Sequence, residues 1–257
     1  MHSNESLGSV VLAAAQSHSV AGDIAANMAR HLAFMAQAAE KGVDVLMFPE
    51  LSLTGYEPAL ARRLALTVQD PCLNPLRDKA RELGITTIVG APIRSTINDD
   101  VLIGALIFHS SGQITVYEKE HLHSGEEAVF GAGTGGAPID LGHERLGLAI
   151  CADFAQTIHP RKAADAGATV YAASVLISES GYAHDADLLS GHARRHRVAV
   201  MIANHAGMTG GWMSGGRSAL WDEDGERVAE LPDAEEGLLI AQRAGKGWIA
   251  HAQKVSL

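Results

Sequence analysis

The sequence predicts an α/β fold in which two stacked sheets with mixed parallel and antiparallel pairing are covered by helices. Apolar strand segments alternate with segments of helical periodicity along the whole chain, which is the order that strand–helix–strand units produce. Several strand segments are apolar almost without interruption, as strands buried on both faces are. One pair of strand segments is joined by a turn too short for a helical crossover, so some of the pairing is antiparallel.

The chain opens with a strand, a helix and a strand. Residues 10–16 (VVLAAAQ) are an apolar strand segment. Residues 22–42 carry apolar side chains at the three- and four-residue spacing of a helix, and Gly42 is a typical stop signal. Residues 43–48 (VDVLMF) return to the strand pattern. The N-terminal part is therefore expected to form one strand–helix–strand unit.

A second helix is predicted between Asn74 and Gly84. Asn74 followed by Pro75 is typical of an N-cap and a first helical residue. Gly84 is a typical end for such a helix. Residues 85–90 (ITTIVG) then form the next expected strand.

A hairpin is predicted in the middle of the chain. Residues 101–108 (VLIGALIF) and 114–119 (ITVYEK) both have strand character, and only a short polar turn separates them. Such a connection favours antiparallel pairing of neighbouring strands.

The second half of the chain repeats the alternation. The expected strands are residues 145–150, 169–175, 198–204 and 237–241, the last being the final strand, and the expected helices cover roughly 156–167 and 184–196. A further hairpin is expected in residues 218–231, around the turn Asp-Glu-Asp-Gly. Because no linker or low-complexity tract interrupts the pattern, we expect residues 1–257 to form a single domain.

Composition excludes several classes of function. The net charge of −10 argues against nucleic acid or an anionic membrane surface as a partner, since both select basic proteins. The longest apolar stretches are too short to span a bilayer. The N-terminal residues lack the basic segment of a secretory signal, and the two cysteines form no disulfide framework. We therefore expect a cytoplasmic location.

Three chemically reactive side chains come at the ends of apolar strand segments. They are a carboxylate, Glu50, an ammonium, Lys119, and a thiol, Cys151. Each alone has an ordinary explanation, namely a helix-start residue, a solvated strand end and a small buried hydrophobe. Together, each at the end of its own strand, they are more typical of a catalytic set.

The segments around these three residues resemble those of the nitrilase superfamily of carbon–nitrogen hydrolases. FPELSLTGY (48–56) is similar to the glutamate segment of the family, YEKEHL (117–122) to its lysine segment and, in part, LAICADF (148–154) to its cysteine segment. ANHAG (203–207) and GGRSALWDEDG (215–225) resemble its C-terminal strands. The resemblance covers nearly the whole chain. It implies a four-layer αββα sandwich and a homodimer or larger homo-oligomer.

The resemblance also implies a thiol mechanism that needs no metal or cofactor. Cys151 would attack the carbonyl or nitrile carbon of the substrate. Glu50 would act as general base and then as general acid. Lys119, helped by the backbone N–H of Ala152, would stabilise the oxyanion. The first half-reaction would leave a thioester on Cys151 and release ammonia or an amine.

Three further residues are candidates for supporting or substrate-binding roles. Glu126 matches the second glutamate of the family by its spacing to the phenylalanine and glycine that follow, and the adjacent Glu127 competes for that role. Tyr56 either lines the pocket or packs. Asp153 matches a residue that is common two places after the nucleophile, and its alternative role is to cap a turn.

The chain also departs from the family pattern. Ala152 stands where an aromatic residue often follows the nucleophile, so the side chain on one wall of the pocket is smaller. True nitrilases usually have Trp-Glu at the positions of Ala152 and Asp153, and this difference favours an amidase. Residues 192–197 (HARRHR) do not keep the helix pattern of the family.

We therefore expect an enzyme that hydrolyses a small aliphatic amide, with N-carbamoyl compounds and nitriles as alternative substrates. A carboxylate on the substrate would need a basic partner, for which Arg217 and Arg94 are candidates. The glycine-rich segment 207–218, which contains Trp212, is either a flexible connection or a loop at the pocket entrance. The match of residues 131–136 (GAGTGG) to a dinucleotide fingerprint is discounted, because no helical pattern follows it.

Two alternatives belong to other classes. The first is a metal-dependent hydrolase that uses the histidine and aspartate cluster within residues 184–205. His192 and His196 lie one helical turn apart, but Ala193 takes the place of the glutamate in the zincin pattern. The second is a non-catalytic binding member of the fold.

Overall fold

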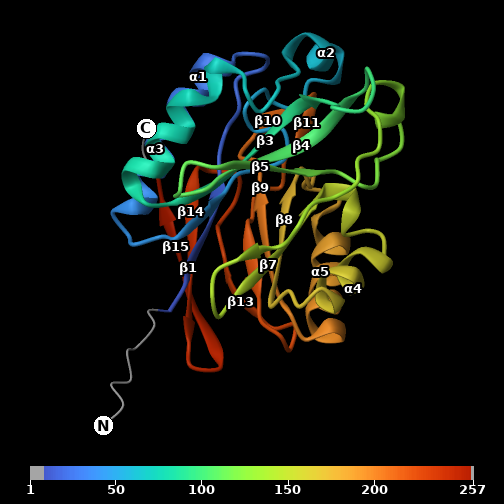
Figure 1. Ribbon diagram of the computed structural model, residues 1–257. Coiled ribbons are helices and arrows are strands. Elements are labelled where there is room, and N and C mark those ends of the chain that lie inside the picture. Colours follow the sequence, from blue (N-terminus) through green and yellow to red (C-terminus); the bar gives the residue numbers. More distant parts are fainter. Residues whose placement is uncertain (1–8, 256–257) are drawn as a thin grey trace.

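Two sheets lie face to face at the centre of the molecule, and helices cover the outer face of each (Figure 1). The computed structural model describes residues 9–255. The N-terminal residues on which the absence of a secretory signal was partly judged, 1–8, lie outside this range. The predicted α/β class and the αββα order of layers are confirmed.

The larger sheet has seven strands in the order β15-β14-β1-β2-β3-β4-β5. Their bounds are Gly247–Lys254 (β15), Gly237–Ala244 (β14), Val11–Gln16 (β1), Val45–Met47 (β2), Thr86–Arg94 (β3), Val101–Phe108 (β4) and Ile114–Glu118 (β5). The strands β1, β2 and β3 are parallel, and every other pair is antiparallel. The predicted hairpin of β4 and β5 is confirmed.

The smaller sheet has six strands in the order β13-β12-β9-β8-β7-β6. Their bounds are Arg227–Glu230 (β13), Ala219–Trp221 (β12), Ala199–Asn204 (β9), Val170–Val175 (β8), Arg145–Ile150 (β7) and Ile139–Asp140 (β6). The central strands β7, β8 and β9 are parallel. A separate two-stranded ribbon of β10 (Met208–Thr209) and β11 (Trp212–Met213) lies in the glycine-rich segment.

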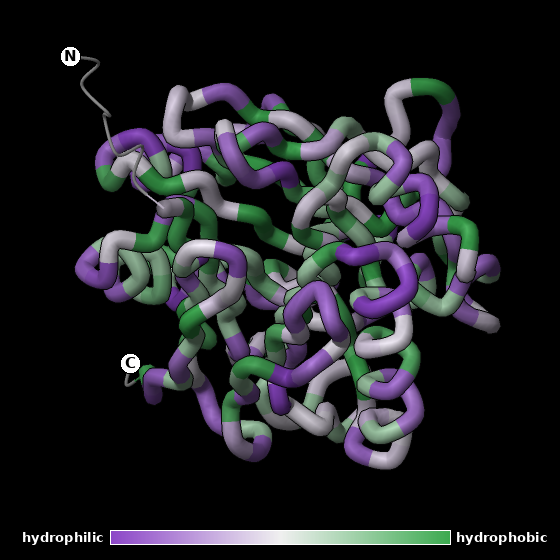
Figure 2. Tube along the Cα trace, turned by 90° about the horizontal axis from the view of Figure 1, so that it is seen from below, coloured by the Kyte–Doolittle hydropathy of each residue, from purple (hydrophilic) through white to green (hydrophobic). Residues whose placement is uncertain are grey.

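Three apolar clusters hold the layers together, and the alternation along β1 shows how. Leu12 and Ala14 face the cluster between the two sheets, whereas Ala13 and Ala15 face the cluster under the helices, because successive side chains of a strand point to opposite faces. Helices cover the outer faces of both sheets. The helices α1 (Ile24–Ala39) and α3 (Asn74–Leu83) cover the larger sheet, and α4 (Ile158–Asp165) and α5 (Tyr182–His196) cover the smaller one, while α2 (Ala61–Leu64) is a single turn. In Figure 2 many hydrophilic residues lie in loops at the rim of the molecule.

Two predicted boundaries were wrong. Asn74 does not cap α3. It is the first residue of that helix, which continues from a turn that Asp70 caps through its side chain. Residues 237–241 are not the final strand, because β14 extends to Ala244 and β15 follows it. The edge strand β15 is mostly exposed, so its sequence lacks the alternation by which strands are recognised.

No helix within residues 9–255 is long and apolar enough to cross a lipid bilayer.

Candidate active site

The ends of three strands bring Glu50, Lys119 and Cys151 together. Glu50 follows β2 and Lys119 follows β5, so both come from the seven-stranded sheet. Cys151 follows β7 in the six-stranded sheet. The group therefore lies where the two sheets face each other.

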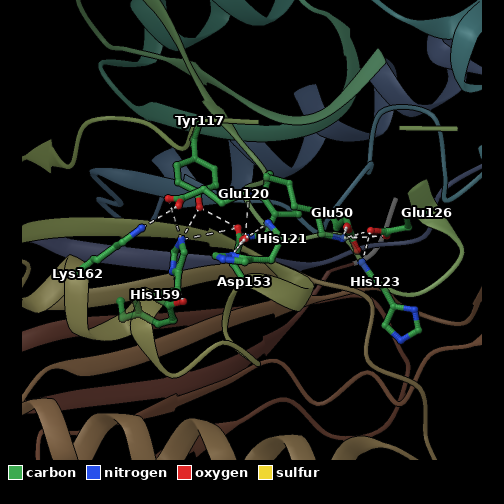
Figure 3. Close-up of polar contacts among 12 residues, drawn as sticks. Glu50, Tyr117, Glu120, His121, His123, Glu126, Asp153, His159 and Lys162 are labelled. Carbon is green, nitrogen blue, oxygen red and sulfur yellow. Dashed lines mark hydrogen bonds and ion pairs between the residues drawn. The ribbon is translucent and has the colours of Figure 1, made fainter. Parts of the chain in front are cut away.

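Lys119 contacts two buried carboxylates, those of Glu50 and Glu126, which are labelled in Figure 3. Its Nζ donates to Glu50 Oε1 at 2.7 Å and to Glu126 Oε1 and Oε2 at 2.9 and 2.8 Å. Glu126, and not the adjacent Glu127, occupies this position. Glu127 is exposed and its carboxylate accepts from the N–H of Gly125. Of the two glutamates that the sequence left in competition, Glu126 is the one that contacts the lysine.

Burial and charge set the protonation of this group. Burial raises the pKa of Glu50 to about 7, although the Lys119 ammonium opposes the shift. Burial also disfavours the Lys119 cation, but the carboxylates of Glu50 and Glu126 around it outweigh this and raise its pKa. Glu50 Oε2 is buried and has no hydrogen-bond partner among the described residues. Glu50 is thus a carboxyl group that can exchange a proton near neutral pH.

Cys151 lies in a sharp turn at the end of β7. Its φ of 43° falls in the left-handed region, which costs a non-glycine residue about 1 kcal/mol or more and is common at active sites. Sγ lies 3.8 Å from the carbonyl oxygen of Leu176. Burial, and next the Glu50 charge, raise the pKa of the thiol, which Lys119 lowers only in part. At rest the sulfur is therefore protonated.

The turn after Cys151 leaves backbone N–H groups free. Residues Cys151–Asp153 form a 3₁₀ turn. The first hydrogen bond of this turn runs from the N–H of Phe154 to the carbonyl oxygen of Cys151. The N–H of Ala152 therefore has no acceptor within the turn. Ala152 is one of the residues that line the cavity.

The backbone around Glu50 is held from two sides. His205 Nε2 donates to the Glu50 carbonyl oxygen at 2.7 Å. On the other side the chain passes so close to Gly90 of β3 that a Cβ there would lie 2.5 Å from the Pro49 carbonyl oxygen and overlap the N atom of Leu51. Leu51 itself has a φ of 52°. The direction of the Glu50 side chain is therefore fixed by its backbone.

Asp153 joins the cysteine turn to the lysine strand and does not line the cavity. Its Oδ2 accepts from Ile150 N at 3.0 Å and from the Tyr117 hydroxyl at 2.8 Å, and its Oδ1 accepts from His121 N at 2.8 Å (Figure 3). His159 contacts the same Tyr117 hydroxyl through Nε2 at 2.7 Å. Asp153 therefore holds groups on both sides of Lys119 in sequence, Tyr117 on one side and Glu120 and His121 on the other.

A cavity of about 490 Å³ opens onto Glu50 and Cys151, a volume suited to a small molecule. Tyr56, Glu126 and Ala152 line it, as the sequence allowed. Sequence reasoning missed other residues of the wall, among them His123, Phe154, Leu176, Ile177 and Gly181, and considered Asp185 only as part of the histidine and aspartate cluster. Trp212 also lines it, which favours the entrance-loop interpretation of the glycine-rich segment. The wall comes from segments far apart in sequence, including α5 and β11, and no local pattern marks its members.

Two sets of residues that the sequence singled out lie elsewhere. Arg217 stacks on Tyr182 and pairs with Glu230, and Arg94 lies at the end of β3, so neither lines the cavity. Within residues 9–255 no three histidine, cysteine or acidic side chains gather as a metal site. His192 Nε2 instead contacts the Phe154 carbonyl oxygen. Residues 131–136 form no helix.

Residues 11–250 match the family model described as carbon-nitrogen hydrolase. The chain belongs to this family. It is a carbon–nitrogen hydrolase of the nitrilase superfamily with amidase-like neighbours.

The most similar structures include an amidase from Nesterenkonia sp. AN1. A cysteine mutant of that amidase in complex with butyramide superimposes with a TM-score of 0.83 at 26% sequence identity, covering 92% of this chain and 91% of that chain.

Two relatives show how far the sequence similarity extends. The 2-oxoglutaramate amidase of Bacillus subtilis is 28% identical over 212 residues, which are 81% of each chain. The glutamine-dependent NAD(+) synthetase of Thermotoga maritima is 27% identical over 224 residues, or 83% of this chain. The chain spans only 38% of the length of that synthetase.

Proposed function

We propose that this hydrolase is an amidase that cleaves the C–N bond of a small aliphatic amide through a thioester on Cys151, releasing ammonia and a carboxylic acid. The observation that carries the proposal is the buried ion pair of Glu50 and Lys119, 2.7 Å apart, whose glutamate lines the same cavity as the thiol. A basic carboxylate, a fixed cation and a nucleophile are the groups that acyl transfer requires.

The first half-reaction forms the acyl-enzyme. Glu50 takes the thiol proton as the sulfur of Cys151 bonds to the carbonyl carbon, and the π electrons of the C=O bond move to oxygen. Lys119 and the N–H of Ala152 stabilise this oxyanion. When the carbonyl re-forms, the C–N bond breaks, and Glu50 delivers its proton to the nitrogen that leaves as ammonia.

The second half-reaction frees the enzyme. Glu50 takes a proton from water as the water oxygen bonds to the thioester carbon. The C–S bond then breaks, the sulfur regains its proton from Glu50, and the carboxylic acid leaves. A pKa near 7 suits a group that must accept and donate a proton in turn.

The shape of the cavity supports a small substrate. Its wall combines apolar side chains, such as Phe154, Leu176 and Ile177, with a few polar groups near Cys151. The butyramide complex of the Nesterenkonia amidase and the name of the Bacillus subtilis relative are consistent with amides. N-carbamoyl compounds and nitriles remain the alternative substrates, and the family resemblance favours a homodimer or larger assembly.

Ammonia release from a panel of butyramide, an N-carbamoyl amino acid and butyronitrile tests the proposal. The native chain is compared with Cys151→Ala and with Cys72→Ala, whose cysteine is exposed and remote from the cavity. Butyramide hydrolysis that disappears only in Cys151→Ala and ignores a chelator supports the thiol mechanism. Turnover that survives in Cys151→Ala, or stops with chelator, overturns it in favour of a metal-dependent reaction.

A further inference from the structure

The charges on the cavity wall are unbalanced. Three carboxylates line it, those of Glu50, Glu126 and Asp185, and no lysine or arginine among the described residues does. Lys119 lies behind the wall, between Glu50 and Glu126, and balances them in part. The carboxylate of Asp185 is not paired with Lys119, and it has no role in the chemistry proposed above.

Asp185 reaches the cavity from the first turn of α5. Its side chain is half-buried, and no described residue forms a hydrogen bond or ion pair with its carboxylate. Burial raises the pKa of Asp185. The charges of His184 and His123 lower it, but by less, so the net shift is upward. Burial of a carboxylate without a fixed partner is unfavourable, and a cationic ligand would remove this cost.

Ser178, which lies near Asp185 on the wall, does not offer a site for an anion. Ser178 Oγ accepts from the N–H of Gly181 and contacts Ser180, so its acceptor sites face the protein. A ligand carboxylate in this cavity would meet Asp185 and Glu50, and His123 is the one titratable basic side chain on the described wall, without a lysine or arginine beside it. Repulsion between like charges in a desolvated pocket disfavours such a ligand.

We propose that Asp185 is a specificity-determining residue, and that its carboxylate binds a cationic group on the acyl part of the substrate. The preferred substrates are then ω-amino amides, in contrast to the ω-amides of dicarboxylic acids. This inference rests on the proposed amidase function. It separates the chain from its Bacillus subtilis relative, whose name denotes an anionic substrate.

A set of isosteric amides tests the inference. Pentanamide is the neutral member, 4-aminobutanamide has an ammonium in place of the terminal methyl group, and glutaramate has a carboxylate at that end. Homologues of the amino amide, one methylene shorter and longer, locate the best distance between cation and amide. For each compound kcat and KM are measured with the native chain, Asp185→Asn and Asp185→Lys, at low and high salt.

The native chain is expected to prefer 4-aminobutanamide over pentanamide in kcat/KM by about tenfold, the effect of one charge-assisted contact, and to use glutaramate least. Asp185→Asn removes this preference through KM, and Asp185→Lys reverses the order of the two charged amides. The preference of the native chain shrinks at high salt, because salt screens the ion pair. Asp187→Asn, an exposed residue of the same helix outside the cavity wall, keeps the native order.

Other outcomes separate the two proposals. Cys151-dependent hydrolysis of pentanamide with no preference for the cation, unmoved by Asp185→Asn, overturns the inference and leaves the amidase function intact. A role of Asp185 in helix stability alone would lower Tm without changing the substrate order. If no amide is hydrolysed, the amidase function fails, and calorimetric titration of Cys151→Ala decides the inference. Tighter binding of the amino amide that Asp185→Asn abolishes supports it, and equal binding overturns it.

Discussion

The hydroxyl of Tyr56 donates a 2.7 Å hydrogen bond to Glu126 Oε1. The same oxygen accepts from Lys119, while Oε2 accepts from Lys119 and from the N–H of His123. Each oxygen of Glu126 thus accepts two hydrogen bonds. Glu50, by contrast, has one oxygen without a partner among the described residues. Glu126 is therefore suited to position the lysine, and Glu50 is suited to exchange protons.

Removal of the Tyr56 hydroxyl should weaken catalysis. Tyr56→Phe leaves Glu126 with one donor fewer, so Lys119 is held less well where the oxyanion forms. A hydrogen bond to a charged group is worth about 1.5–3 kcal/mol, so we expect kcat to fall at least about tenfold. Tyr182→Phe, which removes a hydroxyl that bonds to the Arg217 carbonyl oxygen and does not line the cavity, is the control. Equal losses in the two variants would contradict a local role for Tyr56.

The rate should depend on the protonation of Glu50. Its pKa of about 7 is raised by burial, and only the carboxylate can take the thiol proton. Thus kcat/KM should fall about tenfold per pH unit below 7 and level off above it. Glu50→Gln should lower kcat by about a hundredfold or more. A native profile that stays flat between about pH 5 and 8 would rule out Glu50 as the base with this pKa.

A methyl group at Gly90 should disturb Glu50 without touching it chemically. Gly90→Ala places a Cβ against the backbone of Pro49 and Leu51, and overpacking of this kind typically costs about 1–3 kcal/mol. We expect a lower Tm and a loss of kcat beyond the loss of folded protein. Gly191→Ala is the control, because nothing lies within 4 Å of the added Cβ in a helix. Full activity per folded molecule in Gly90→Ala would contradict this role of the close contact.

Acid should destabilise the fold through two buried histidines. Burial lowers the pKa of His31 and of His205 to about 4, below the unfolded value of about 6.5. The folded state therefore binds fewer protons than the unfolded chain between these values, and stability present above pH 6.5 is lost as the pH falls. Each group should contribute up to about 1.4 kcal/mol per pH unit.

Urea unfolding at a series of pH values measures this loss. His31→Gln should reduce the slope of the free energy of unfolding against pH, whereas His251→Gln on the exposed surface should leave it unaltered. A slope that His31→Gln does not change would exclude His31 as a source of acid sensitivity.

Much of the fold and the core of the site could be predicted from the sequence. The buried strands β2 and β7 leave continuous apolar runs, so the strand ends near Glu50 and at Cys151 could be located. Lys119 was placed at the end of the second strand of the predicted hairpin, β5, which is a partly exposed edge strand. The edge strand β15 was missed because most of its side chains are exposed. Asp153 follows β7 of the smaller sheet, whereas its partner Tyr117 lies in β5 of the larger sheet, and a contact between two sheets leaves no local sequence pattern. Asp185 was noticed only as part of a histidine cluster, since its place on the cavity wall depends on how α5 packs.

The reactive groups are divided between the two sheets, with Glu50 and Lys119 on one and Cys151 on the other. Neither sheet alone holds a complete set, and the segments that meet are distant in the chain. Such non-local contacts form late and depend on the final packing of the layers. Mild denaturant that loosens the sandwich should therefore stop turnover while each sheet still keeps its backbone hydrogen bonds. In this enzyme, loss of activity would be an early signal of unfolding, ahead of any change in secondary structure.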